Sequence, residues 1–251
     1  MAVRIGPKGG RSRLGRPGRP YGWPVPSKII EVAEEWSPKK VFVWALEWPG
    51  WCRSGRDPQS ALDALALAAG RYAGAARRAG VAFPIDGAEF VTVTRVEGDG
   101  GTAFGVPSVI TDYDRRPVRA AEARKIAALI ASSWAIFDEV AANAPENLRK
   151  GPRGGGRDTS RVVTHVEEAD HAYAREIGLK VKPPHDRETV EGTRKATVDA
   201  LGRPSDGSPL GGRKWPQRYA ARRIAWHALD HAWEIEDRTP EAAKNRAHPF
   251  G

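Results

Sequence analysis

The chain has 251 residues, of which 40% are apolar and 28% are charged, and its formal net charge is +9. This length suits one large or two modest domains, and the apolar share is sufficient for a packed core. The absence of any run of about 18 apolar residues argues against a membrane span. Cys52 is the single cysteine, which excludes an intrachain disulfide.

The positive charge is concentrated at the N-terminus. Residues 1–26 contain six basic residues and no acidic one, so the rest of the chain carries +3. The glycines and prolines of this stretch, without apolar periodicity, predict a disordered basic tail. Such a tail can bind phosphates, but a solvated tail, or a true start at Val25, is favoured. Nucleic acid is therefore not an expected partner, and with no secretory signal the expected location is the cytoplasm.

Residues 27–117 are expected to form an α+β module. Short β-prone runs predict strands at residues 29–32, 41–46 and 90–96. A helix lies between the second and third runs, because Asp57 is a good N-cap and Pro58 suits the first helical position. Its buried stripe is expected to consist of Leu62, Leu65, Ala69, Tyr72 and Ala76.

This module contains the sequence VFVWALEWPGWCRSGRDPQSALDAL at residues 41–65, a strand, a Trp-Pro-Gly turn and an Ala-rich helix. The pattern resembles the HicB-like fold of antitoxins and related small domains. The resemblance implies an accessory or dimerisation module, and a homodimer is left open. No helix-turn-helix or ribbon-helix-helix segment accompanies it, so a DNA-binding antitoxin role is not expected.

Four helices are predicted within residues 118–240 from apolar positions that recur with the period of a helix. They cover residues 120–142, 158–177, 187–201 and 217–237. The first has the clearest stripe, formed by Ile126, Leu129, Ile130, Ser133, Phe137 and Val140. A polar tail, residues 241–251, follows the last helix. The expected fold class is thus α+β, with a small strand-helix-strand module followed by a four-helix bundle.

A glycine-rich basic loop leads into the second of these helices. Its candidate anion-binding residues are Arg153, Gly154, Gly155, Gly156 and Arg157. Backbone N–H groups and the dipole at a helix N-terminus attract anions. The loop lacks the spacing of a P-loop, and a solvated connector is the alternative interpretation.

The last predicted helix carries His227 and His231, which are four residues apart. Residues at this spacing share one helix face, and both continue the apolar stripe, so both imidazoles are expected to point inward toward one metal ion. His165, which flanks the stripe of the second helix, is the expected third ligand. Glu168 and Asp230 are candidates to support the ligands by hydrogen bonds. Histidines that only form hydrogen bonds across a bundle are the alternative.

The remaining histidines are not expected to be ligands. His171 neighbours charged residues on the helical wheel, His185 follows two prolines in a connector, and His248 lies in the polar tail. If the three chosen histidines bind one ion, their nearest ring nitrogens should lie roughly 3 to 4 Å apart. Three histidine ligands with open positions suit Zn, Ni or Fe.

The region from about residue 118 to residue 238 resembles the DinB-like superfamily of metal-binding four-helix bundles. The matching segments are RVVTHVEEADHAY, which contains His165, and IAWHALDHAWEIEDR, which contains His227 and His231. The resemblance implies a thiol-dependent transferase or isomerase, or a metal-assisted hydrolase, acting on a small-molecule substrate. A low-molecular-weight thiol would be the cosubstrate, mycothiol in a GC-rich actinobacterium. The competing hypothesis is a non-enzymatic binding or regulatory module that recruits a partner through the HicB-like part.

Overall fold

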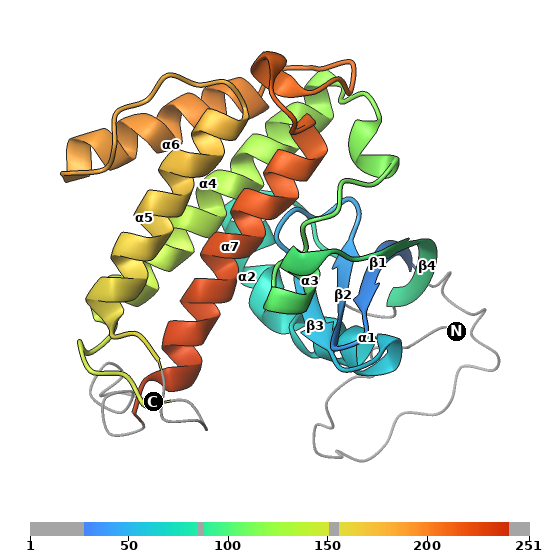
Figure 1. Ribbon diagram of the computed structural model, residues 1–251, viewed down its shortest axis with the longest axis horizontal. Coiled ribbons are helices and arrows are strands. Elements are labelled where there is room, and N and C mark those ends of the chain that lie inside the picture. Colours follow the sequence, from blue (N-terminus) through green and yellow to red (C-terminus); the bar gives the residue numbers. More distant parts are fainter. Residues whose placement is uncertain (1–27, 85–87, 151–155, 241–251) are drawn as a thin grey trace, which may run out of the picture. The chain divides into compact units, whose positions relative to one another are not determined.

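A computed structural model describes residues 28–84, 88–150 and 156–240 (Figure 1). The expected tails, residues 1–26 and 241–251, lie outside the described residues, as do three members of the predicted anion loop, Arg153, Gly154 and Gly155. The fold is α+β, as predicted, because a four-stranded mixed sheet is followed by a predominantly helical region.

The described residues divide into two compact units, here called the sheet unit and the helical unit. The sheet unit comprises the described residues of Met1–Glu47, Cys52–Gly74 and Ala82–Val109. The helical unit comprises those of Trp48–Trp51, Ala75–Val81 and Ile110–Gly251. The two units therefore interleave along the chain, whereas the sequence predicts a single boundary near residue 118.

The sheet unit is built on four strands in the order β3-β2-β1-β4. The strands are β1 (Lys28–Ser37), β2 (Lys40–Ala45), β3 (Cys52–Gly55) and β4 (Ala88–Glu97). β2 pairs antiparallel with both β1 and β3, and β4 pairs parallel with β1. The three predicted strands correspond to β1, β2 and β4. β3 is not predicted, because its sequence, CRSG, has no β-branched or aromatic residue.

The second half of β1 is acidic in sequence yet buried, which explains why the predicted strand ends too early. The carboxylate of Glu35, which is 0% exposed, accepts hydrogen bonds from the backbone N–H groups of Ser108 at 3.0 Å and Val109 at 3.1 Å. It also accepts one from the hydroxyl of Thr102 in α3 (Gly100–Phe104). A buried carboxylate needs such donors, and these bonds attach the segment after β4 to β1.

The helix expected after β3 forms as two helices, α1 (Pro58–Leu67) and α2 (Ala69–Arg78), with a break at Ala68. The cap is as predicted, because the Asp57 side chain accepts a hydrogen bond from the N–H of Ser60 at 2.8 Å. All five residues of the predicted apolar stripe are buried. The apolar pattern thus predicted the buried face correctly but did not predict the break at Ala68.

The helical unit contains the four predicted helices, each within one residue of its predicted ends. They are α4 (Ala120–Asn143), α5 (Thr159–Glu176), α6 (Arg187–Leu201) and α7 (Gln217–Arg238). Two short 3₁₀ helices, η1 (Tyr113–Arg115) and η2 (Leu210–Gly212), lie in the connections. α4 and α5 each contact both α6 and α7, so the four helices close around a common core (Figure 1).

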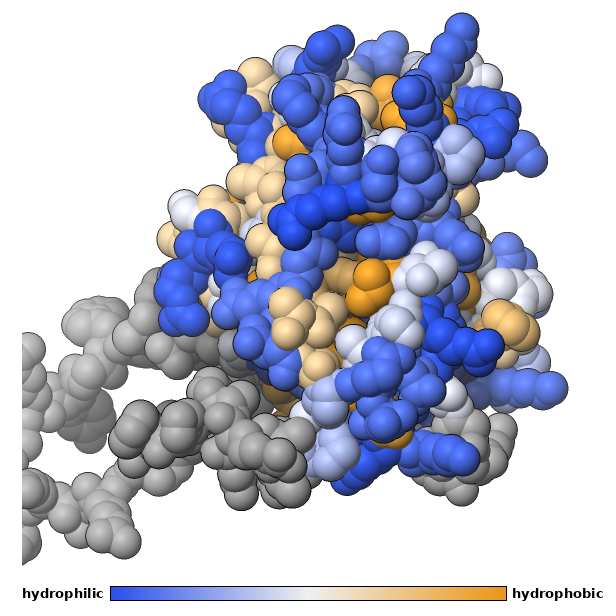
Figure 2. Space-filling model, turned by 90° about the vertical axis from the view of Figure 1, so that its left-hand side faces the viewer, coloured by the Kyte–Doolittle hydropathy of each residue, from blue (hydrophilic) through white to orange (hydrophobic). Residues whose placement is uncertain are grey.

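α5 and α6 each bury one side. The buried residues are Val162, Val166, Asp170 and Ala174 on α5 and Val190, Thr193, Thr197 and Leu201 on α6. On the face shown in Figure 2, hydrophilic residues predominate and hydrophobic residues appear only as small separate patches. The apolar spacing in the sequence of α5 predicts that Ala169 and Tyr173 lie on its buried side, whereas the buried positions in that part of the helix are Asp170 and Ala174.

α7 is buried on nearly all faces, whereas the sequence predicts a single inward stripe. Sixteen of its 22 residues are buried. It contacts α4, α5 and η1, and also Gly50, where φ is 94° and an added Cβ would lie 3.0 Å from Leu229 and 3.1 Å from Ala225. Glycine alone tolerates both this backbone conformation and this close approach.

Among the described residues, α4 is the one helix long and apolar enough to cross a membrane by length and composition alone. Its most apolar 18-residue window has a mean hydropathy of 1.2, and 44% of that window is buried inside the protein. Five of the six residues predicted for its apolar stripe are buried. Packing within the helical unit therefore accounts for the apolar residues of α4.

Candidate metal centre

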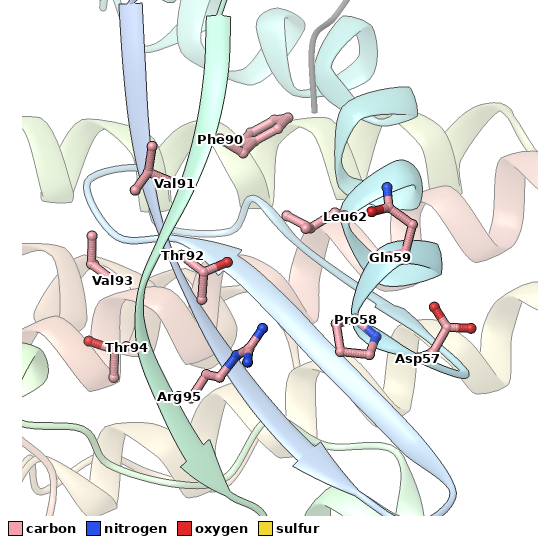
Figure 3. A pocket seen from close by; sticks show the side chains of 10 residues that line it. All are labelled: Asp57, Pro58, Gln59, Leu62, Phe90, Val91, Thr92, Val93, Thr94 and Arg95. Carbon is pink, nitrogen blue, oxygen red and sulfur yellow. The ribbon is translucent and has the colours of Figure 1, made fainter. Parts of the chain in front are cut away.

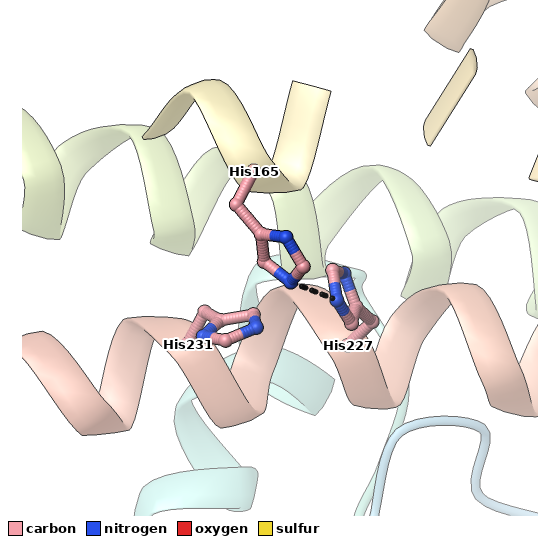
Figure 4. Close-up of side chains that lie close together, drawn as sticks. All are labelled: His165, His227 and His231. Atoms are coloured by element: carbon pink, nitrogen blue, oxygen red, sulfur yellow. Dashed lines mark hydrogen bonds between the residues drawn. The ribbon is translucent and has the colours of Figure 1, made fainter. Parts of the chain in front are cut away.

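Three histidines from two helices of the helical unit converge, as predicted (Figure 4). His165 Nε2 lies 3.2 Å from His227 Nε2, and one ligand atom from each of His165, His227 and His231 lies within 4.8 Å of the other two. The ring centroids are 4.6 to 5.0 Å apart. The three side chains, here called the histidine cluster, are therefore close enough to hold one metal ion.

Local helix geometry explains this convergence. His227 and His231 are one turn apart on α7, so both project from the same side of that helix. His165 lies on α5 next to the buried residues Val162 and Val166, at the edge of the face that packs inward. Contact between α5 and α7 then brings the third imidazole to the pair.

The electrostatic environment keeps two of the imidazoles neutral. Burial lowers the pKa of His165 to about 4, and the positive charge of Arg157 contributes in the same direction. Burial also lowers the pKa of His227 well below its ordinary value of 6.5, and His231 and Arg223 add to this effect. A metal ion binds the neutral form of histidine, so these side chains are in the ligand form at neutral pH.

Glu234 orients His231. The Nδ1–H of His231 donates a hydrogen bond to Glu234 Oε2 at 2.8 Å, which leaves the Nε2 lone pair for a metal ion. Arg238 Nη1 donates to the other carboxylate oxygen at 2.9 Å. The hydrogen bond from His231 and the charge of Arg238 both lower the pKa of Glu234. A carboxylate that supports a ligand histidine in this way is common at metal sites.

His227 differs from His231 in the hydrogen bonding of its Nδ1. Its Nδ1 is buried and forms no hydrogen bond with any described residue. Its Nε2 faces His165 Nε2. A buried ring nitrogen without a partner is costly, and a site that receives a ligand is one setting in which such an atom persists.

An open hollow of about 430 Å³ borders the histidine cluster. It is lined by Arg157, Ser160, Arg161, Thr164, His165 and Glu168. The hollow gives His165 a side open to solvent, edged by two arginines.

The other residues expected at the site are placed as follows. Glu168 is exposed on α5 and lines the hollow beside His165. Asp230 is half-buried on α7. Of the predicted anion loop, Gly156 and Arg157 are described, and Arg157 lines the hollow. The carboxylate that contacts a cluster histidine is instead that of Glu234, which is not among the site residues predicted from the sequence. Its position three residues after His231, on the same side of a helix, is the signal in the sequence that could have identified it.

The histidines not chosen as ligands lie elsewhere. His171 is half-buried on α5 and does not belong to the cluster. His185 is exposed, and its ring nitrogens contact Asp186 Oδ2 at 3.1 Å and the carbonyl of Pro183 at 3.2 Å. His248 lies outside the described residues. Cys52 is buried at the start of β3 in the sheet unit and is not part of the group of ligand side chains found among the described residues.

A second polar cluster on α5 was not predicted. Asp170 is 4% exposed, and its two oxygens accept hydrogen bonds from Trp134 Nε1 and Arg194 Nε, each at 3.0 Å. Arg194 Nη1 also donates to Asp138 at 2.9 Å. Asp170, Trp134, Arg194 and Asp138 are here called the aspartate network. It joins α4, α5 and α6, and each charged group in it has a partner.

Comparison of the chain with protein-family models, with curated proteins and with solved structures finds no match. The resemblances carried by residues 41–65 and by the three histidines therefore stay expectations. Function is inferred below from the residues of the site, because a fold by itself does not determine an activity.

Proposed function

We propose that His165, His227 and His231 bind one divalent metal ion and leave positions open for water or a substrate. The observation that carries the proposal is the convergence of three ring nitrogens within 4.8 Å, two of them on imidazoles that burial keeps neutral. The carboxylate of Glu234 behind His231 supports it further. Zn, Ni and Fe are the ions that suit three histidines.

The chemistry proposed for this site is thiol-dependent group transfer or isomerisation, or metal-assisted hydrolysis, in a cytoplasmic DinB-like protein. When bound, such an ion lowers the pKa of a coordinated water or thiol and polarises a substrate oxygen. Glu234 fixes the orientation of His231, and the hollow beside His165 admits small molecules. The resemblance implies one histidine on the second helix of a DinB-like bundle and an HxxxH pair on the last. The order here supports the proposal, since His165 lies on α5 and His227 and His231 lie on α7.

Metal content tests this proposal directly. Protein purified without an affinity tag should contain about one equivalent of metal by elemental analysis, because the three histidines form a single site. His231→Ala should abolish metal uptake, because two histidines are left. His171→Ala is the matched control on α5 and should retain full uptake. Equal losses in both variants, or a metal-free wild type that takes up no added Zn, Ni or Fe, would refute the site.

The alternative function is a non-enzymatic module in which the sheet unit, as a HicB-like domain, binds a second copy of the chain. A hollow of about 660 Å³ between α1 and β4 favours it (Figure 3). Val93, 47% exposed, borders this hollow on β4. Within the described residues β4 ends the sheet, and its outer edge pairs with no strand. Unpaired strand edges are common sites of β-strand pairing between chains.

Sedimentation of the purified protein distinguishes this alternative. If β4 forms a dimer interface, Val93→Arg should yield a monomer, because an arginine would place a charge in the apolar contact. Leu67→Arg, at a site 83% exposed on α1, is the control and should leave the dimer intact. A wild type that sediments as a monomer would remove the alternative.

A further inference from the structure

Arg223 is a buried cation without a carboxylate partner among the described residues. Its side chain lies on α7 and is 8% exposed, and its Nη1 is buried and forms no hydrogen bond. No carboxylate of the described residues forms an ion pair with it. The guanidinium instead lies over two aromatic rings, with Cζ 5.3 Å from the centroid of Tyr173 and 4.8 Å from that of Trp226. The guanidinium is thus held between or beside two aromatic rings, and its buried Nη1 has no hydrogen-bond acceptor among the described residues.

Other arginines of the helical unit that are largely buried pair with carboxylates, and the neighbouring Arg222 is an example. Arg222 is also 8% exposed, but its Nε and Nη2 each donate to one oxygen of Asp114 at 3.0 Å. Arg194 and Arg218 likewise pair with carboxylates, Asp170 and Glu122. A buried charge without a counter-charge is strongly unfavourable, so the exception, Arg223, calls for an anion from outside the described chain.

The position of Arg223 connects it to the histidine cluster. It precedes His227 by one helical turn, and its charge is among the causes that lower the pKa of His227. The ring of Tyr173 lies 5.5 Å from the ring of His227 as well as over Arg223. Tyr173 therefore borders both groups.

The charges around the histidine cluster also favour an anionic ligand. A divalent ion on three neutral histidines would add two positive charges to those of Arg223 and Arg157, whose fields both reach His227. Glu234 is the carboxylate bonded to the cluster, and Arg238 already pairs with it. The loaded site would thus hold an excess of positive charge in a partly buried setting, which an anionic ligand would offset.

We propose that Arg223 binds the carboxylate of a small anionic ligand that occupies the open side of the metal at the histidine cluster. This inference rests on the proposed function and specifies its substrate class. A guanidinium is a planar fork of N–H donors that matches the planar geometry of a carboxylate, and the buried Nη1 of Arg223 is such a donor without an acceptor among the described residues. Arg223 is on this basis the residue that selects carboxylates over neutral molecules of the same shape.

Calorimetry on the zinc-loaded full-length protein tests the inference, with propionate as the probe and propionamide as its neutral isostere. Wild type should bind propionate at least about tenfold more tightly than propionamide, since only propionate can accept a hydrogen bond from Arg223 between two charged groups. Arg223→Met removes the donors with a similar side-chain length and should lower that preference about tenfold, because only the charge of the zinc ion then still favours the anion. Arg187→Met removes a cation on α6 that is 90% exposed and does not line the hollow beside His165, and it should leave the preference within about threefold of wild type, as expected for a screened surface charge.

Two further measurements keep the outcomes distinct. Zinc stoichiometry is measured on every variant, so a wild type without zinc refutes the metal site, whereas a zinc-loaded wild type without a preference for propionate refutes the role of Arg223 alone. Arg223→Lys keeps the charge and loses the fork, and it should retain part of the preference. A preference that stays within about threefold of wild type in a folded, zinc-loaded Arg223→Met protein, or that Arg223→Lys retains in full, would also overturn the inference.

Discussion

Two polar clusters have members on α5, His165 in one and Asp170 in the other, five residues apart. They differ in how their hydrogen bonds are satisfied. In the aspartate network, both oxygens of Asp170 have donors and Arg194 bridges two carboxylates. In the histidine cluster and next to it, His227 Nδ1 and Arg223 Nη1 are buried without partners among the described residues. A satisfied network is an internal part of the fold. The region of the histidine cluster, in contrast, contains buried polar atoms whose hydrogen bonds the described residues do not satisfy.

The pKa shifts of the two clusters also have opposite consequences. Burial raises the pKa of Asp170 to about 6, and the charge of Arg194 opposes that rise. The carboxylates of Asp170 and Asp138 keep the pKa of Arg194 raised despite its burial. Both groups of this pair are therefore charged at neutral pH. The buried histidines are uncharged under the same conditions. The aspartate network therefore contains a buried ion pair, whereas His165 and His227 are neutral and lie with their Nε2 atoms 3.2 Å apart.

The largest expected effect breaks the aspartate network. Asp170→Ala should lower the free energy of unfolding by about 3 to 5 kcal/mol, because it leaves the largely buried Arg194 with only the exposed Asp138. Urea denaturation of the metal-free protein at pH 7.5 measures it. The double variant Asp170→Leu, Arg194→Met should recover much of the loss, since apolar groups can replace a buried pair. A cost below about 1 kcal/mol for Asp170→Ala would contradict the comparison, because surface pairs give such values.

The second prediction concerns stabilisation by metal. Zinc at about 100 times its dissociation constant should raise the free energy of unfolding by about 2.7 kcal/mol, because only the folded state assembles the site. His227→Ala should remove this increment. Asp170→Ala should keep the full increment although it starts from a less stable protein, since the two clusters have no residue in common. Thermal unfolding with and without zinc checks this, and loss of the increment in Asp170→Ala would show that the clusters are coupled.

The third prediction sharpens the role of Glu234. Glu234→Gln should weaken zinc binding about 10- to 100-fold, as is usual when a carboxylate behind a ligand histidine is lost. Glu168→Gln, at the exposed edge of the hollow, is the control. Competition with a chelator of known affinity gives the constants. If Glu168→Gln weakens zinc binding more than Glu234→Gln does, Glu168 is the residue that supports the ligands.

The smallest expected effect is a pH dependence of opposite sign in the two clusters. The pKa of His165 falls from 6.5 to about 4 on folding, so its contribution to stability is present above pH 6.5 and is lost as the pH falls toward 4. The pKa of Asp170 rises from 3.8 to about 6, so its contribution is present below pH 3.8 and is lost as the pH rises through 6.

Urea denaturation of the metal-free variants at pH 4.5 and pH 7 resolves these signs. The stability advantage of wild type over His165→Gln should grow between the two pH values, and its advantage over Asp170→Asn should shrink. The same direction of change for both variants would show that burial does not set the two pKa values as described.

Local patterns in the sequence predict what depends on neighbours along the chain. The Asp57 cap, the ends of α4 to α7 and the shared face of His227 and His231 all follow from contacts within about four residues, which the helical repeat fixes. His165 was found because it flanks an apolar stripe, so the three-histidine group could be predicted before its geometry was known.

The remaining features depend on partners that are distant in sequence. Asp170 interrupts an apolar stripe, and its burial is possible only because Trp134, 36 positions earlier, and Arg194, 24 positions later, supply donors. Arg223 and Glu234 look like ordinary surface charges on a helical wheel. The wheel predicts one inward face, whereas packing encloses α7 on nearly all sides.

The sequence by itself therefore determined the helices, the class of fold and which histidines meet. Tertiary structure alone decided which charges are buried and which of them lack partners, because the cost of burying a charge depends on the groups that other helices bring to it. That distinction, and not the residue type, separates Arg222 from Arg223.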